Sequence, residues 1–114
     1  TEIDLGWVKK PPTTVRRVHI LSGDRDLIPE DIPRLREKFN GMVNDYESAP
    51  TAWVCARNKT KDFILRRLSD LVDKSGGEAY DGTATAWFEA TKKVMSSLFN
   101  VLPDWVTYFR KQQG

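Results

Sequence analysis

The sequence predicts a mainly α-helical fold, a small bundle of three long helices and a short C-terminal helix. Apolar residues recur every three to four positions in several stretches, and this spacing places them on one face of a helix. Two such stretches are Ile32, Leu35, Phe39, Met42 or Val43, and Tyr46, and later Trp87, Val94, Met95, Leu98, Val101 and Leu102. A helical face of this kind must be buried against another element, so we expect the helices to stack around one core.

The chain has the size and composition of one domain. It holds 114 residues, of which 39% are hydrophobic and 11% aromatic, and this supplies enough apolar area for a single core. We expect an extended N-terminal arm over residues 1–14, where Gly6 and the pair Pro11-Pro12 block regular structure. Residues 15–114 then form a single helical domain.

A short β element near residues 15–21 fits beside the helices. This segment is rich in β-branched residues and partly alternates, which favours a strand over a helical turn. The turn Ser22-Gly23-Asp24 ends it. Residues 51–57 stay open between helix and strand, and as a strand they would pair with residues 15–21.

The first long helix is predicted from Pro29 or Ile32 to Glu47. Proline fits the first turn of a helix, where its missing N–H would lack a partner in any case. Gly41 inside this helix costs about 1 kcal/mol relative to alanine, which indicates close packing at that point. Pro50 stops the helix.

Two more long helices and a short one follow. The second is predicted from Thr60 to Lys74 and is closed by Gly76-Gly77. Its apolar stripe is Ile64, Leu68, Leu71 and Val72. The third helix is predicted from Thr83 to Asn100, and Pro103 then opens the short terminal helix.

The sequence contains few residues that could form a catalytic site. The chain has one histidine and one cysteine, which leaves His19 as the sole imidazole for a nucleophilic triad and excludes a zinc site in practice. His19 is expected to be an exposed structural residue. The sequence contains no glycine-rich phosphate loop. We therefore expect a protein that is not an enzyme, with no metal site, no cofactor and no small-molecule ligand indicated.

The cysteine and the hydropathy pattern suggest where the protein works. Cys55 lies in an apolar run and is predicted to be a buried small hydrophobic residue. A lone cysteine favours a reducing, intracellular compartment, with cytoplasm and nucleus both open. No apolar run approaches the roughly 20 residues needed to cross a bilayer, so membrane insertion is not expected. Because the chain begins at Thr1, we expect a domain of a larger or processed protein.

One string resembles a known class of enzymes. Residues 18–21 form an apolar strand that ends in Ser22-Gly23-Asp24-Arg25-Asp26. A strand ending in Ser-Gly-Asp-x-Asp resembles the metal-binding turn of PIN- and NYN-type ribonucleases, and the resemblance implies that Asp24 and Asp26 bind a divalent ion. The predicted helices, however, follow one another without the alternating strands of that fold. A solvated acidic turn before a helix is the competing interpretation, and a metal-dependent ribonuclease is the remote alternative.

Nucleic-acid binding, to RNA or DNA, is the main alternative function. The basic candidates are Lys9, Lys10, Arg16, Arg17, Arg66 and Arg67. Tryptophan rings would supply stacking surfaces for bases. The formal net charge is only +2, however, and the predicted second helix carries opposite charges at i,i+4 spacing, as in Asp62–Arg66 and Asp70–Lys74. That pattern is typical of an ordinary solvated face.

The first-ranked function is that of a non-enzymatic interaction domain that binds a protein partner. Such a domain needs a rigid scaffold with aromatic residues on its surface. The candidate partner-binding residues lie outside the long helices or off the main stripe of the terminal helix. They are Trp7, Trp53, Tyr80 and Tyr108.

Overall fold

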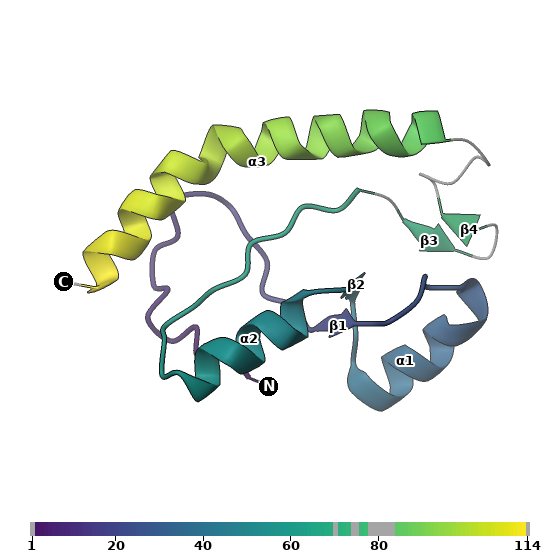
Figure 1. The fold of residues 1–114 in the computed structure, drawn as a ribbon, viewed down its shortest axis with the longest axis horizontal. Coiled ribbons are helices and arrows are strands. Elements are labelled where there is room, and N and C mark those ends of the chain that lie inside the picture. Colours follow the sequence, from purple (N-terminus) through teal and green to yellow (C-terminus); the bar gives the residue numbers. More distant parts are fainter. Residues whose placement is uncertain (1, 70, 74–75, 78–83, 114) are drawn as a thin grey trace. The chain divides into compact units, whose positions relative to one another are not determined.

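The protein forms two compact units, one of them assembled from both ends of the chain. The computed structural model describes residues 2–69, 71–73, 76–77 and 84–113 (Figure 1). Unit 1 comprises Thr1–Leu5 and Arg16–Leu65, and unit 2 comprises Gly6–Val15 and Arg66–Gly114. The N-terminal arm is therefore divided, because most of it groups with the C-terminal half of the chain.

Unit 1 is built on a parallel strand pair. Strand β1 (Ile20–Ser22) pairs with β2 (Val43–Asp45), in the register Ile20↔Val43 to Ser22↔Asp45. The connection between them contains a 3-10 helix, η1 (Pro29–Asp31), and a helix, α1 (Ile32–Phe39). Parallel strands need such a crossover because a tight hairpin can join only antiparallel ones. The predicted bundle of three long helices and a short C-terminal helix is therefore wrong, since unit 1 has a β–α–β arrangement.

The predicted helix from Pro29 or Ile32 to Glu47 is wrong beyond Phe39. Asn40 ends α1 in the left-handed conformation, with φ 51°, and its N–H donates to the Arg36 carbonyl. A Cβ built on Gly41 would lie 2.3 Å from Leu21 Cδ1. The glycine thus lets the returning chain approach β1 closely enough for β2 to pair with it. Pairing between distant strands outweighs the local helical period here.

Helix α2 (Ser48–Arg57) follows β2 and packs against β1. Residues 51–57, which the sequence left open between helix and strand, belong to α2. They therefore do not pair with residues 15–21. Pro50 lies in the first turn of α2 rather than at a helix boundary, where its missing N–H costs nothing. Thr60 N donates to the Cys55 carbonyl at 2.9 Å just past the end of this helix.

The predicted helix from Thr60 to Lys74 is wrong. Residues 61–69 form no regular element, and Val72–Asp73 is a short strand, β3. The consecutive residues 62–65 are all half-buried. An extended segment covered on both sides buries neighbours in this way, whereas a helix covers only the residues of one stripe. The i,i+4 pair Asp62–Arg66 accordingly has no helix to carry it, and Asp70 and Lys74 lie outside the described residues.

Unit 2 consists of a small antiparallel pair, a long helix and the arm. Strand β3 pairs with β4 (Gly76–Gly77), and helix α3 spans Ala84–Gln113, 30 residues. The predicted third and terminal helices are therefore one helix with Pro103 inside it, which is the second error in the bundle prediction. An internal proline removes one hydrogen bond and bends the axis, and Figure 1 shows α3 change direction toward its C-terminal part.

Candidate functional sites

The carboxyl ends of β1 and β2 meet at one edge of unit 1. Ser22 ends β1, Asp45 ends β2, and the two are partners in the register. Ser22 Oγ donates a hydrogen bond to Asp45 Oδ1 at 2.7 Å and accepts one from Ala49 N at 2.8 Å. In open α/β sheets this is the edge at which ligands bind. We refer to its polar residues, Ser22, Asp24, Asp26, Asp45 and Ser48, as the carboxyl-edge cluster.

Both carboxylate oxygens of Asp45 accept hydrogen bonds within unit 1. The Ser48 hydroxyl donates to Oδ2, and Ser48 N donates to Oδ1 at 3.2 Å. Ser48 is buried, so this carboxylate satisfies a polar side chain that has left water. Asp45 consequently ties the end of β1 to the start of α2.

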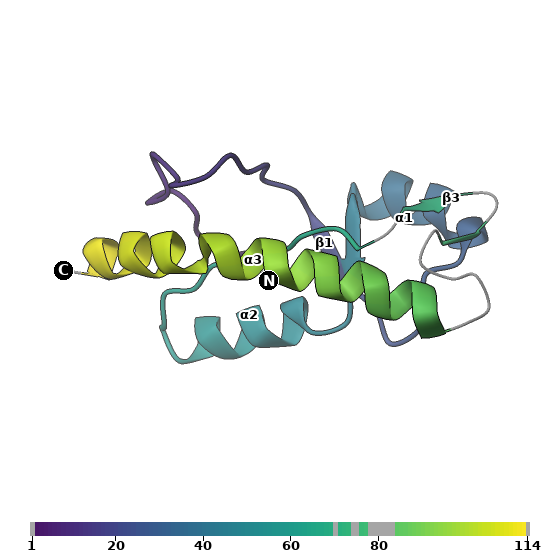
Figure 2. The same cartoon turned by 90° about the horizontal axis from the view of Figure 1, so that it is seen from above.

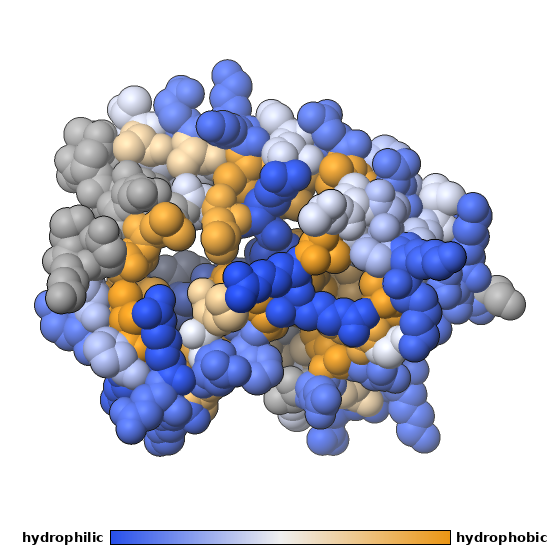
Figure 3. Space-filling view, turned by 180° about the vertical axis from the view of Figure 1, so that it is seen from behind, coloured by the Kyte–Doolittle hydropathy of each residue, from blue (hydrophilic) through white to orange (hydrophobic). Residues whose placement is uncertain are grey.

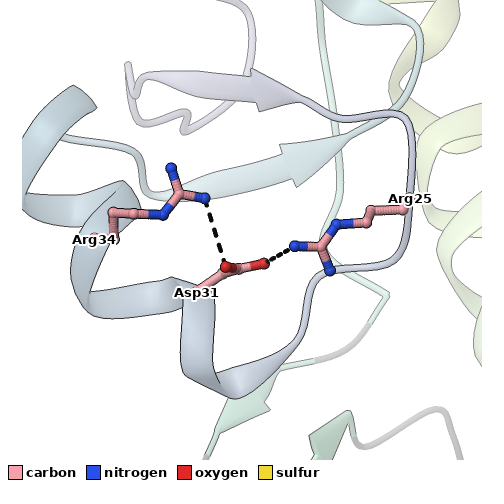
Figure 4. Close-up of polar contacts among 3 residues, drawn as sticks. All are labelled: Arg25, Asp31 and Arg34. Carbon is pink, nitrogen blue, oxygen red and sulfur yellow. Dashed lines mark hydrogen bonds and ion pairs between the residues drawn. The ribbon is translucent and has the colours of Figure 1, made fainter.

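The acidic turn after β1 is exposed and lies next to two arginines. Asp24 and Asp26 are both exposed, and Tyr46 Oη donates to Asp26 Oδ1 at 2.7 Å. Asp31 at the end of η1 forms ion pairs of 2.5 Å with Arg25 and 3.5 Å with Arg34 (Figure 4). The two guanidinium groups approach this carboxylate from opposite sides.

The carboxyl-edge cluster does not fit a preformed divalent-metal site. Such a site needs several carboxylate oxygens that converge on one point. Within residues 2–69, 71–73, 76–77 and 84–113, no three His, Cys, Asp or Glu side chains lie close enough to hold a metal ion. The β1–α1–β2 crossover does supply the alternation of strand and helix that the predicted elements lacked.

Aromatic rings join the arm to the C-terminal part of α3 in unit 2. Trp7 stacks on Tyr108 with 6.1 Å between the ring centroids and meets Phe109 edge-on at 5.5 Å. Figures 1 and 2 both show the arm, in purple, beside the C-terminal half of α3. Two of the predicted partner-binding residues, Trp7 and Tyr108, are therefore packed on each other.

Polar contacts fix the same cluster. Trp105 Nε1 donates to Thr13 Oγ1 at 2.9 Å, and Lys9 N donates to the Tyr108 hydroxyl at 3.1 Å. Trp105 is only 3% exposed and lies edge-on to Tyr108 at 6.0 Å. Val8 of the arm is buried as well. The core of unit 2 is thus centred on one tryptophan that has its indole N–H satisfied.

The other predicted site residues are dispersed. Trp53 on α2 is 53% exposed, with the Arg57 guanidinium over its ring at 4.9 Å, and Tyr80 lies outside the described residues. The six basic candidates are all exposed. Arg16 and Arg17 belong to unit 1 and the other four to unit 2.

The two single residues of catalytic interest also have plain structural surroundings. His19 is exposed, and its carbonyl accepts hydrogen bonds from Met42 N and Val43 N where β2 begins. Cys55 is half-buried rather than fully buried. Neither residue is placed in the carboxyl-edge cluster.

An apolar stripe on α3 is exposed, which the sequence interpretation missed. Its residues are Phe88, Met95, Phe99, Leu102 and Val106. Their exposed fractions lie between 39% and 62%. At 100° per residue they fall within an arc of roughly 60°, and Figure 3 shows apolar side chains open to the surface among polar ones. Phe88 and Phe99 were overlooked because the stripe expected on the same helix, around the half-buried Val94 and Leu98, has a similar period.

No helix among the described residues is long and apolar enough to cross a membrane. Comparisons with known proteins add no relative: no protein-family model, no curated protein and no solved structure matches the chain.

Proposed function

We propose that this chain is a non-enzymatic interaction domain that binds a protein partner through the apolar stripe of α3. The observation that carries the proposal is the exposure of five large apolar side chains in one line on a helix. Single exposed apolar residues are normal on the surface of a monomer, whereas a contiguous apolar stripe marks an interaction site. Amphipathic helices bind partners through side chains at this spacing.

The aromatic residues of the stripe fit the role of binding hot spots. Phe88 and Phe99 have the largest exposed fractions in the stripe, and truncation of aromatic contacts costs the most in protein interfaces. Trp53 remains a second candidate contact. Trp7 and Tyr108 act as packing residues of unit 2 in this proposal, because each ring is engaged by the other.

Photo-crosslinking tests the proposal on the whole chain in its own cells. A benzoylphenylalanine at position 99 should give a discrete adduct on illumination, and the same group at position 100 should give much less. Asn100 is exposed and adjacent but lies off the stripe, which makes it the matched control. Equal labelling at both positions, or none at either, would contradict binding through the stripe.

A second candidate function is metal-dependent cleavage of RNA at the carboxyl-edge cluster. It is favoured by the Ser22-Gly23-Asp24-Arg25-Asp26 string at the carboxyl end of a parallel strand, where the ribonuclease resemblance requires it. The observation against this function is that the carboxylates of the described residues do not converge on one point where a metal ion could bind. The test is to add magnesium or manganese and to measure thermal stability and RNA cleavage. Asp24→Asn should abolish both effects, and Glu30→Gln in the neighbouring η1 should leave them unchanged.

The dependence of affinity on salt concentration distinguishes nucleic-acid binding without cleavage from the binding of a protein partner. Contacts to phosphates release counterions, so the affinity would fall steeply as the salt concentration rises. Short single- and double-stranded RNA and DNA are the probes, and Arg16→Glu with Arg17→Glu is the variant. Salt-steep binding lost in this variant would place nucleic acid ahead of a protein partner.

A further inference from the structure

The spacing of the exposed stripe on α3 is that of a coiled-coil seam. Positions 88, 92, 95, 99, 102 and 106 alternate steps of four and three residues, and all but Lys92 are apolar. This alternation is the a/d pattern of a heptad repeat, in which each side chain inserts between side chains of a facing helix. The stripe therefore fits another helix that carries the same pattern.

We infer that the occupant of this stripe is α3 of a second copy of the chain, packed in the antiparallel direction. The inference rests on the proposed function and names the partner of the same surface. A second copy carries the matching pattern by definition, and a two-fold interface between copies pairs each residue with a partner twice. Phe99 then lies opposite Leu102 of the second copy, and Met95 lies opposite Val106.

Charge decides the direction of the pairing. Parallel packing would set Lys92 in the seam against Lys92 of the second copy, and like charges at that position oppose association. Antiparallel packing instead sets each Lys92 near the Phe109 end of the other helix. This arrangement avoids the repulsion, because the lysine stem can lie along the seam while its charged head reaches water.

The flanks of the stripe supply complementary charges in the antiparallel arrangement only. Glu89 and Arg110 lie three heptads apart and so occupy the same flanking position at opposite ends of the helix. Both are exposed. In an antiparallel pair this flank faces itself, so Glu89 of each copy lies beside Arg110 of the other. In a parallel pair, Glu89 and Arg110 would each face the other flank of the second helix, and so would not lie beside each other.

The experiment measures the mass of the whole chain in solution by sedimentation equilibrium across a wide range of protein concentration. We expect a dimer that dissociates on dilution. Phe99→Glu should make the chain monomeric, because it sets a charge in the centre of the seam. Asn100→Glu adds the same charge on the same turn outside the seam and should leave the dimer intact. Far-ultraviolet circular dichroism must show that both variants keep their helix content.

Exchanging the charges of Glu89 and Arg110 tests whether the two helices pack in the antiparallel direction. Glu89→Arg and Arg110→Glu should each weaken the dimer roughly three- to tenfold, as expected for two exposed ion pairs per dimer. The double variant should restore it, since the two charges have merely changed places. A monomer at all concentrations would overturn the inference, and so would a dimer that survives Phe99→Glu or a double variant that is no tighter than the single ones. A monomer that still gives a crosslinked adduct at position 99 would refute the second copy while leaving the proposed function standing.

Discussion

Unit 1 and unit 2 are held together by different kinds of contact. In unit 1 the buried residues among those the structure describes are small, Ser48 and Ala52, and the strand ends are joined by hydrogen bonds around Asp45. In the described part of unit 2 the buried residues are Val8 and Trp105, and the Trp7 ring of the arm packs against Tyr108 and Phe109 of α3. One unit depends on polar geometry and the other on the burial of large apolar side chains.

This difference determines what each unit tolerates. Loss of an apolar side chain removes its transfer free energy and leaves a cavity, which is costly at a single large buried ring. Loss of one hydrogen bond from a polar network costs less, because water partly replaces it. We therefore expect the largest mutational effects in unit 2 and smaller, more local effects in unit 1.

Trp105→Ala should have the largest effect. It removes the most buried ring of unit 2 together with its hydrogen bond to Thr13 Oγ1, and we expect a loss of about 3–5 kcal/mol in the free energy of unfolding. Urea denaturation followed by near-ultraviolet circular dichroism measures it. Trp87→Ala on the same helix is the control, because Trp87 is 47% exposed and should cost far less. Equal losses in the two variants would show that the arm does not form the core of unit 2.

Gly41→Ala should be the most damaging small change in unit 1. The new methyl group would lie 2.3 Å from Leu21 Cδ1 and 2.7 Å from Leu21 Cγ, and overpacking of this kind costs about 1–3 kcal/mol. Combining it with Leu21→Ala should cost less than the sum of the two single variants, since the second change makes room for the first. Additive losses, measured by thermal unfolding, would contradict the close contact between these residues.

The sequence predicted turns and points of close packing better than it predicted helices. A strand was expected near residues 15–21, followed by a turn at Ser22-Gly23-Asp24. The observed β1 is shorter, Ile20–Ser22, and includes Ser22. Close packing at Gly41 was also expected, although inside a helix rather than before a strand. These features depend on local steric properties of glycine and β-branched residues, which a sequence displays directly.

The errors arose where tertiary contacts outweigh local periodicity. Val43 fits a helical stripe as well as it fits a strand, and only pairing with Ile20 selects the strand. The same holds for residues 61–69, whose apolar spacing is helical although they form no helix. The carboxyl-edge cluster shows the limit most clearly, since Asp45 becomes a partner of Ser22 only after the crossover brings β2 beside β1.

Ser22→Ala should have a moderate effect confined to unit 1. The hydroxyl makes two hydrogen bonds, to Asp45 Oδ1 and from Ala49 N, and losing both should cost about 1–2 kcal/mol. Hydrogen exchange at the Ala49 amide should accelerate, because its acceptor is gone. Thr51→Ala is the control, since the Thr51 hydroxyl bonds only to the Glu47 carbonyl on the exposed side of α2. An unchanged Ala49 amide in Ser22→Ala would contradict the link between β1 and α2.

Arg25→Gln should have the smallest effect, although its ion pair with Asp31 is short, at 2.5 Å. The Arg25 side chain is 64% exposed, so water screens the attraction and holding the long side chain in place costs entropy. A median exposed pair contributes only about 0–1 kcal/mol. Arg34 lies 3.5 Å from the same carboxylate and partly replaces the lost charge.

The dependence on salt sharpens this last expectation. Thermal unfolding at low and high salt should show a small difference between Arg25→Gln and the unchanged chain that disappears at high salt, because screening weakens exposed pairs. Asp31→Asn removes the shared partner of both arginines and should cost more than either arginine variant alone. If Arg25→Gln instead cost as much as Gly41→Ala, and kept that cost at high salt, the ion pair would hold the turn after β1 in place. Unit 1 would then depend on this ion pair as strongly as it depends on the close packing at Gly41.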